Sequence, residues 1–420
     1  MKQKSICILG LGYIGLPTAA FLASKKTNVL GVDIDKKKIK ELNSLNFTSK
    51  EKGLETLVKD SIRKGHLKIK NVPEKSDVFI ITVPTPFKNL KKSKFPTPDI
   101  SYIKKSIFSI SNILEKDNLI ILESTSPVGT TDKIVTWLSK LRPDLSFPKA
   151  SNKNPKKPDV FISYCPERVL PGDILKELKN NDRIIGGQTK FCSNKAYNFY
   201  KGFVGGNLFQ TDSKSAEMSK LAENAYRDLN IAYANEISMI CDDLKIDPYN
   251  LIHLSNKHPR VNILNPGPGV GGHCIAVDPW FLVAQDEMNS RLIRTARQIN
   301  DYKTDWVIEK IKSRASTIFH QKRVKPKIAC LGLAFKADID DLRGSPALKI
   351  AISLISLGYE VIAIEPNIKR HTVVELEELD NVLNKDIVLV VLVKHKEFLE
   401  QSVREKLISL GALDFCGALS

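Results

Sequence analysis

Residues 5–15 read SICILGLGYIG, an apolar run followed by glycines at Gly10, Gly12 and Gly15. An apolar, β-branched run ahead of this spacing predicts a buried strand, a tight turn and then a helix. In such a turn the first glycine allows the bend, the second lets the backbone approach a pyrophosphate, and the third lets the helix pack on the strand. The stretch therefore predicts a dinucleotide-binding α/β domain, with Tyr13 and Ile14 also at the cofactor. A turn of purely structural use is the alternative.

A carboxylate, Asp33, ends the next strand-like run at residues 29–33. In a dinucleotide-binding fold this place belongs to the acid that accepts the ribose hydroxyls, and its charge repels the 2′-phosphate of NADP. We therefore expect NAD as the cofactor. The lysines at 36–38 keep NADP open as the alternative, and Lys38 is one of the expected cofactor contacts.

The composition indicates a globular protein with more than one domain, since 420 residues exceed one ordinary domain. Its seven cysteines are scattered without a CxxC pair, which is typical of a reducing compartment and argues against a zinc site. The basic start followed by residues 5–23 also resembles a signal peptide, but the glycines favour a nucleotide site. We expect a cytoplasmic protein with no metal and no membrane segment.

The net charge of +17 raises the possibility of nucleic acid or a membrane surface as a partner. The excess is mostly lysine, spread over segments such as 88–94 and 149–157, without aromatic interleaving or a nucleic-acid-binding motif. We expect no nucleic-acid partner and only a mild attraction for anionic substrates. The role of the two lysine-rich segments stays open.

The order of elements predicts three parts. Strand-like and helix-like runs alternate at first, which predicts a parallel, doubly wound sheet. A long helical pattern without Gly or Pro follows at 212–245, and a second extends over 278–319. Further strand-like runs then return with helical segments between them. We expect a Rossmann-like domain at 1–205, a helical middle region at 206–322 and a Rossmann-like α/β domain at 323–420. The predicted strands are 5–9, 29–33, 78–83, 119–123, 160–164, 327–331, 361–364 and 387–392.

Several loops follow these strands and carry polar groups. Those at 82–86 and 123–130 bring Thr85 and Thr125 to the carboxyl edge of the sheet, where ligands bind in open α/β folds, although such loops are often only turns. The loop at 164–172 adds a carboxylate and a guanidinium, and 256–260 adds two basic groups. Together they suggest a site for a polyanionic substrate such as a nucleotide sugar.

Two other patterns leave alternatives open. The run 265–281 reads NPGPGVGGHCIAVDPWF and must be an irregular loop, so its Cys274 is either incidental or a working thiol. On the predicted middle helix, Lys220, Asn224 and Arg227 fall on one face, which is either a wet surface or a site. The spacing alone does not decide.

The predicted C-terminal sheet carries a turn, GLAFK, with a single glycine, so it is not a second dinucleotide fingerprint. Ser345 and Pro346 are expected as N-cap and first residue of the next helix. Lys336 and Arg343 are candidate phosphate contacts there.

Taken together, these motifs resemble the family of NAD-dependent nucleotide-sugar dehydrogenases, the UDP-glucose/GDP-mannose dehydrogenase family. The resemblance covers nearly the whole chain: GLGYIGLP, VPTP, ESTSPVGT, CPERVLPG, KLAENAYRD, GPGVGGHCIAVDP and GLAFK…DDLRGSP. GGHCIAVDPWF, with NKHPRVN ahead of it, is similar to the branch that acts on acetamido sugars. The resemblance implies a UDP-N-acetylhexosamine substrate, the manno epimer first and the gluco epimer second, with UDP-glucose less favoured.

The resemblance implies oxidation of a sugar C6 alcohol to a carboxylate with two NAD, and a product used in surface polysaccharide synthesis. By resemblance, Cys274 adds to the intermediate aldehyde, and the thiohemiacetal loses a second hydride to give a thioester. Lys220 and Asn224 would stabilise the oxyanion, Asp278 and Glu167 would hold or activate water, and Thr125 would lie near the nicotinamide. The glycines would let the substrate approach the sulfur.

The same resemblance implies the remaining contacts and a homodimer built on the middle helix, with Arg260 serving the neighbouring subunit. A two-electron β-hydroxyacid-type dehydrogenase and a non-catalytic NAD-binding regulator are the competing interpretations. The expected substrate-site residues are Glu167, Arg168, Val169, Lys220, Asn224, Arg227, His258, Arg260, Gly271, Phe335 and Lys336, and Arg343 is assigned to the cofactor.

Overall fold

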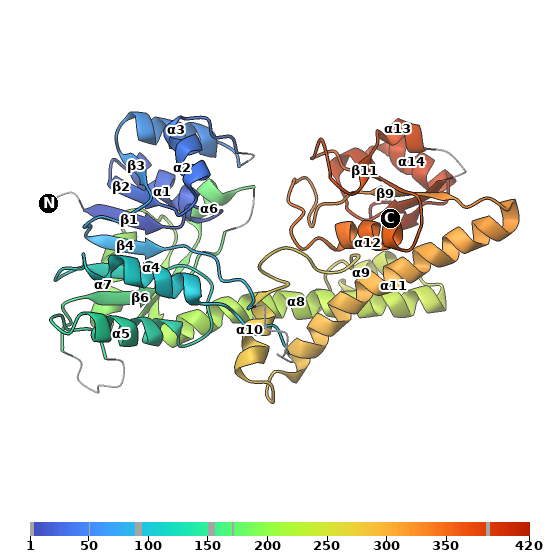
Figure 1. The fold of residues 1–420 in the computed structure, drawn as a ribbon. Coiled ribbons are helices and arrows are strands. Elements are labelled where there is room, and N and C mark those ends of the chain that lie inside the picture. The colour runs from blue at the N-terminus through green and yellow to red at the C-terminus, as the bar shows by residue number, and fades with distance from the viewer. Residues whose placement is uncertain (1–3, 50, 89–94, 150–155, 170–171, 384–386) are drawn as a thin grey trace. The chain divides into compact units, whose positions relative to one another are not determined.

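The computed structural model describes residues 4–49, 51–88, 95–149, 156–169, 172–383 and 387–420 (Figure 1). The chain divides into two compact units, Met1–Ala222 and Glu223–Ser420, and the boundary falls inside the long helix α8 (Ser213–Leu244). The division into parts at 205 and 322 stays a prediction. Most of the lysine-rich segments at 88–94 and 149–157 lies outside the described residues.

The first unit is built on an eight-stranded sheet in the order β3-β2-β1-β4-β5-β6-β7-β8. β1 pairs in parallel with both β2 and β4, so the strand order reverses at β1 as in a dinucleotide-binding fold. The strands predicted for this unit are confirmed, with small shifts at their ends. The bounds are β1 Ser5–Leu9, β2 Asn28–Val32, β3 Leu67–Lys70, β4 Val78–Ile81, β5 Leu119–Leu122, β6 Phe161–Tyr164, β7 Arg183–Gly187 and β8 Leu208–Asp212.

Helices cover both faces of this sheet (Figure 1). Ile6 and Ile8 of β1 enter one hydrophobic core, and Cys7 and Leu9 enter the other. Because side chains alternate across a strand, a sheet buried on both faces needs apolar residues at every position, hence the unbroken apolar runs. The helices are α1 Gly15–Ser24, α2 Lys36–Asn43, α3 Leu54–Arg63, α4 Ser101–Ser111, α5 Thr130–Leu141, α6 Ile174–Asn180 and α7 Lys190–Tyr200.

The last two strands, β7 and β8, depart from the predicted parallel sheet. β7 runs antiparallel to β6, with Tyr164 opposite Gly186, whereas β8 is parallel to β7. An antiparallel strand begins where its neighbour ends. Arg183, the first residue of β7, therefore lies at the carboxyl edge of β6, beside the loops that bind ligands in this type of fold.

The second unit contains a five-stranded parallel sheet in the order β11-β10-β9-β12-β13, again with an apolar core on each face. Val307 and Ile311 of helix α11 enter the core on one face. The strands predicted here are confirmed as β9, β10 and β12. The bounds are β9 Lys327–Leu331, β10 Val361–Ile364, β11 Glu375–Leu376, β12 Ile387–Val391, β13 Leu413–Asp414, α9 Pro248–Ser255, α12 Pro346–Ser356, α13 Leu379–Val382, a 3₁₀ turn at Lys396–Leu399 and α14 Gln401–Ser409.

The predicted helix over 212–245 is confirmed as α8, but the continuous helix over 278–319 is wrong. The chain there forms α10 (Asp278–Gln285) and α11 (Arg291–Lys322). Between them Asp286 accepts the Asn289 amide at 3.1 Å, and its carbonyl accepts the Ser290 hydroxyl at 2.5 Å. Short polar side chains that bond nearby backbone groups favour a turn over a helix. Among the described residues we find no helix with the length and apolar content that a membrane crossing needs.

Candidate active site

The turn after β1 has the shape that the three glycines predict. Gly10 has φ +94°, and a Cβ there would lie 2.8 Å from the Thr82 carbonyl oxygen. A Cβ on Gly15 would lie 1.8 Å from the Gly10 oxygen, so this glycine allows α1 to start against the turn itself. Gly12 faces open space, and α1 begins beside it without a side-chain cap on Ile14. Open backbone at a helix N-terminus fits a dinucleotide pyrophosphate.

Asp33 lies directly after β2 and is held by three donors. Its carboxylate accepts the Leu11 and Asp35 amides and the Lys38 ammonium, each at 3.0 Å. Partial burial opposes ionisation, but the hydrogen bonds outweigh it and lower the pKa of Asp33. The group therefore offers a fixed negative charge directly after β2, and its contact with the cofactor ribose stays a prediction. Tyr13, between the glycines, is 40% exposed.

The two threonine loops meet at the carboxyl edge of the sheet. The Thr85 hydroxyl donates to the Thr125 carbonyl oxygen at 2.7 Å. Behind them, Glu217 of α8 is fully buried and accepts the Gly129 amide at 2.6 Å, together with the amide and hydroxyl of Thr131 at 2.8 and 2.6 Å. Glu217, which the sequence analysis did not identify, therefore fixes the start of α5 and the loop before it.

A buried cluster of charges surrounds Glu167. Its carboxylate forms an ion pair with Arg183, and the same guanidinium donates to Glu123 at 3.1 Å. The Tyr200 hydroxyl also donates to Glu123, at 2.6 Å. Burial raises the pKa of Glu123 to about 7, although Arg183 opposes the rise. Glu167 had been predicted, but Arg183 had not, because its side chain reaches Glu167 only through the antiparallel pairing of β7 with β6.

In the second unit, the glycine-rich loop leads to Cys274, four residues before α10. Its side chain is exposed, whereas five of the other cysteines are buried and Cys416 is half-buried. Burial raises the pKa of Cys7 and of Cys330 to about 12, which leaves those thiols protonated and unreactive. The carbonyl of Cys274 accepts the Val277 and Asp278 amides at 3.0 and 2.8 Å, which sets the residue at the entrance to α10.

The glycines of this loop are needed for packing inside the unit. A Cβ on Gly271 would lie 2.7 Å from the Gly344 oxygen and 2.9 Å from Cβ of Phe335, and one on Gly272 would lie 3.1 Å from the Phe335 ring. Gly269, at φ +141°, lies against the Thr304 hydroxyl. A side chain at Gly271 or Gly272 would therefore collide with the chain itself, and the role of these glycines in substrate approach stays a prediction.

Two of the predicted catalytic side chains are in contact in this unit. The Asn224 amide of α8 donates a short hydrogen bond to Asp278, which begins α10 and is 3% exposed. This bond fixes the amide of Asn224, so its oxygen points away from the carboxylate. Lys220, one turn earlier on α8, is half-buried, and Arg227 is exposed.

A row of amides behind the loop was also missed by the sequence analysis. The Gly267 amide donates to Asn235 Oδ1 at 2.9 Å, Asn235 Nδ2 donates to Asn300 at 2.8 Å, and Asn300 Nδ2 donates to Asp228 at 2.7 Å. Arg297, 1% exposed, completes the row by pairing with Asp228 at 2.6 Å. A backbone donor at one end and a carboxylate at the other allow only one orientation of both amides, so the loop backbone is tied to α8 and α11.

The backbone amides in the turn after β9 bind a carboxylate of the protein, Glu365, which directly follows β10. The amides of Leu333 and Ala334 donate to Glu365 at 2.7 and 2.9 Å, and Glu365 pairs with His395 Nε2 at 3.1 Å. Burial would raise the pKa of Glu365, but the bonds from His395 and the turn amides lower it to about 2. The two amides that could bind an external anion in this turn are thus already bonded to the Glu365 carboxylate. The predicted cap is confirmed, since Ser345 Oγ accepts the Leu348 amide and Pro346 starts α12.

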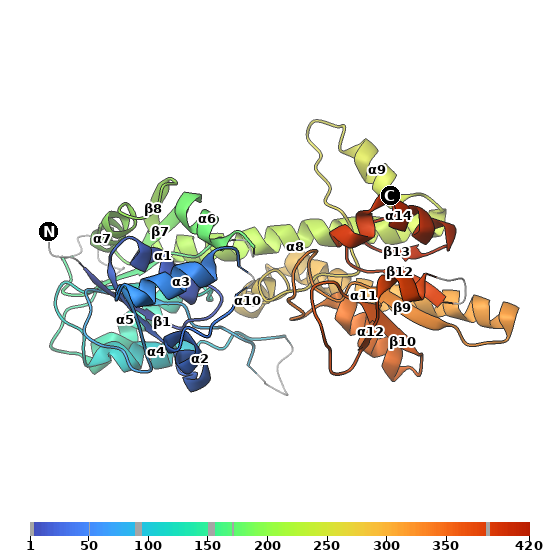
Figure 2. The same ribbon diagram turned by 90° about the horizontal axis from the view of Figure 1, so that it is seen from above.

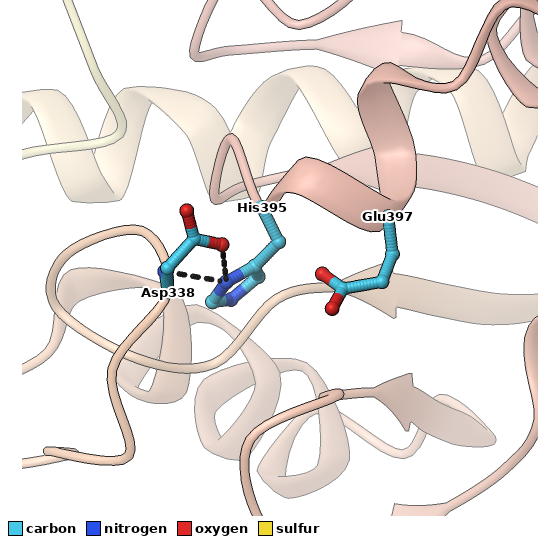
Figure 3. Close-up of side chains that lie close together, drawn as sticks. All are labelled: Asp338, His395 and Glu397. Atoms are coloured by element: carbon cyan, nitrogen blue, oxygen red, sulfur yellow. Dashed lines mark hydrogen bonds and ion pairs between the residues drawn. The ribbon is translucent and has the colours of Figure 1, made fainter. Parts of the chain in front are cut away.

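One group of potential metal ligands occurs among the described residues, formed by Asp338, His395 and Glu397 (Figure 3). His395 is fully buried, its Nδ1 accepts the Asp338 amide at 2.9 Å, and its Nε2 faces Glu365. Both ring nitrogens are therefore engaged with protein groups, and the cluster is explained by the turn that it supports.

The other predicted contacts are spread over both units. Val169 packs on the core of the first unit. Lys336 is exposed, and the Arg343 guanidinium is held by Asp341 at 2.9 Å, which leaves its assignment to the cofactor a prediction. His258 and Arg260 are exposed on the loop after α9, which projects from the second unit in Figure 2.

Comparison with known proteins covers almost the full chain. Residues 4–204 match the NAD binding domain of the UDP-glucose/GDP-mannose dehydrogenase family, residues 214–302 its central domain and residues 329–414 its UDP binding domain. The chain is 49% identical over 405 residues to UDP-N-acetyl-D-mannosamine dehydrogenase of Campylobacter jejuni, covering 94% of this chain and 97% of the relative.

Two further similarities extend this comparison. The chain is 47% identical over 401 residues to NDP-N-acetyl-D-galactosaminuronic acid dehydrogenase of Ralstonia nicotianae, covering 94% of this chain and 92% of that protein. Its fold is similar to that of the UDP-D-ManNAc dehydrogenase of Pyrococcus horikoshii, with a TM-score of 0.86 at 35% identity over 99% of this chain and 96% of the other.

Proposed function

The chain belongs to the UDP-glucose/GDP-mannose dehydrogenase family of NAD-dependent nucleotide-sugar dehydrogenases, and from this premise we propose that it oxidises UDP-N-acetyl-D-mannosamine to the corresponding uronate. The observation that carries the proposal is the exposed thiol of Cys274 at the entrance to α10. The first oxidation of an alcohol gives an aldehyde, and a thiol that adds to it creates the tetrahedral carbon from which a second hydride can leave.

The proposed steps divide between the residues of the chain. NAD, when bound, supplies the hydride acceptor for both oxidations. Cys274 forms the C–S bond, Lys220 and Asn224 stabilise the developing oxyanion, and Asp278 holds the Asn224 amide in the orientation this requires. Glu167 takes a proton from the water that hydrolyses the thioester.

We assign the nucleotide of the substrate to the second unit, which contains the match to a UDP binding domain. Phe335, beside Gly272, and the exposed Lys336 are the proposed contacts for the uridine and the phosphates. The cytoplasm, where NAD and UDP-sugars are available, is the proposed compartment.

A homodimer is the proposed assembly. α8 exposes large apolar side chains at spacings that follow a heptad, which is the pattern of a helix packed on another helix. The projecting loop after α9 would carry Arg260 to the partner subunit. The exposed stripe consists of Tyr226, Tyr233, Ile240 and Leu244. Light scattering tests this assembly, and a monomer at micromolar concentration would contradict it.

The substrate assignment is tested by offering the purified protein NAD with UDP-N-acetylmannosamine, UDP-N-acetylglucosamine, UDP-N-acetylgalactosamine and UDP-glucose. We expect the highest kcat/KM for the manno sugar and two NADH for each sugar consumed. The Ralstonia relative makes the galacto sugar the main competitor. Faster turnover of any other sugar would overturn the substrate, and one NADH per sugar would overturn the thiol chemistry.

A further inference from the structure

Arg183, Glu123 and Glu167 form a buried cluster, the Arg183 cluster, with one carboxylate more than is needed to neutralise the guanidinium. Arg183 is 5% exposed, and one buried carboxylate would be enough to neutralise its guanidinium. Here two carboxylates share it, Glu123 from the end of β5 and Glu167 from the loop after β6. With both ionised, the buried cluster would carry a net negative charge.

The surroundings of the two carboxylates show how this charge is divided. Glu123 has a fully buried side chain, and its Oε2 has no hydrogen-bond partner within the described structure. Because burial raises its pKa to about 7, Glu123 holds a proton for much of the time near neutral pH. The charge of Arg183 is then available to Glu167.

The geometry also fixes where Glu167 points. Continuing the antiparallel register of β6 and β7 places Glu167 directly opposite Arg183. The Arg183 guanidinium lies 4.5 Å from the centre of the Tyr200 ring, and one of its terminal nitrogens donates a hydrogen bond to Glu123. The other oxygen of Glu167 accepts the Arg168 amide at 2.8 Å. Each oxygen retains a second lone pair, which can accept a hydrogen bond from water.

We propose that Arg183 is a positioning residue for Glu167, holding its carboxylate in the orientation needed to activate the water that hydrolyses the proposed thioester. This rests on the function proposed above. Glu167 takes one proton from water, the water oxygen bonds to the thioester carbon, and the C–S bond breaks with its electron pair going to Sγ of Cys274. The step consumes no oxidant, and both hydrides have already left.

The test separates acyl release from the oxidations. The Arg183→Met and Arg183→Lys variants are each mixed with NAD and UDP-N-acetylmannosamine, and NADH formation is followed through the first turnover. The mass of the intact protein in quenched samples is then measured by mass spectrometry. Arg142→Met is the matched control. It removes a guanidinium of the same unit that pairs with Asp144 at 2.6 Å and donates to the carbonyls of Ser111 and Leu114, none of which belongs to this cluster.

We expect Arg183→Met to produce its first-turnover NADH and then accumulate a covalent adduct on Cys274, because displacing a reacting group by about 1 Å slows its step by about 100-fold. Arg183→Lys keeps a buried positive charge, so it provides a folded variant if Arg183→Met fails to fold, and should show a smaller accumulation. Arg142→Met should show none.

A purely structural role predicts a different result. NADH formation and uronate release would then fall together, without an adduct, in both Arg183 variants, and this would overturn the proposal. If the unmodified protein oxidises none of the UDP-sugars, the proposed function itself has failed, and the role of Arg183 in it fails too. The unmodified protein therefore distinguishes the two failures.

Discussion

Replacing Asp33 by serine should transfer the cofactor preference from NAD toward NADP. The Asp33 carboxylate accepts three hydrogen bonds, and its lowered pKa keeps it charged throughout the neutral range. A hydrogen bond from a ribose hydroxyl to a charged acceptor contributes about 1.5–3 kcal/mol. Serine is too short and carries no charge, so the affinity for NAD should fall by about 10- to 150-fold.

The same change should favour NADP, because it releases Lys38 from its 3.0 Å contact with Asp33. The freed ammonium can pair with the 2′-phosphate, and the repulsion between that phosphate and the carboxylate is removed. If this relief is similar in size to the NAD loss, the ratio of kcat/KM for NAD to that for NADP falls by about 100-fold or more.

The assay is the steady-state rate of NADH or NADPH formation with the sugar at saturation. Asp35→Ser is the matched control. Asp35 caps α2 by accepting the Lys37 and Lys38 amides at 2.9 and 3.2 Å, and serine is an equally favourable cap. An unchanged cofactor ratio in Asp33→Ser, or an equal change in Asp35→Ser, would refute the assignment of Asp33 to the ribose.

Three other changes should have distinct outcomes. Cys274→Ala should abolish the uronate, because no thiohemiacetal can form, and normal yield from the folded variant would contradict the covalent route. Glu217→Gln turns an N–H toward the amides of Gly129 or Thr131 and should destabilise the first unit by about 2–4 kcal/mol, seen in its urea midpoint. Lys303 is 2% exposed, and burial lowers its pKa from 10.5 to about 7. The unfolded chain therefore binds more protons between those values, and stability rises with pH there. Lys303→Met should flatten this rise and stabilise the protein at pH 7, whereas an unchanged slope in urea denaturation would contradict it.

Most of the fold could be predicted because local patterns report it. Residues 5–9 alone indicated the first strand, since a sheet covered on both faces leaves no polar positions in its central strand. The turn through Gly10 and Gly15 could also be predicted, because a side chain at either position would collide with nearby backbone atoms. The break between α10 and α11 was missed because helical periodicity outweighed the polar turn residues around Asp286.

The supports of the site could not be read in this way. Arg183 contacts Glu167 across 16 residues that include helix α6, and Asn235 contacts Asn300 across 65 residues between two helices. Neither pairing leaves a periodic trace in the sequence. The only available signal was an arginine at the head of the apolar run RIIGG, where a solvated charge would be out of place.

The closed turn after β9 has a consequence for the timing of the reaction. Glu365 accepts the amides of Leu333 and Ala334, so the backbone of this turn, as far as the structure describes it, is not open to a dinucleotide pyrophosphate as the backbone beside Gly12 is. If, as we propose, the protein reduces two NAD for each sugar at the site beside Gly12, that site must be used twice. The first NADH has to leave, and a fresh NAD has to enter, while the half-oxidised sugar waits. Retention of that reactive intermediate during cofactor exchange is therefore as much a demand on this protein as the hydride transfers themselves.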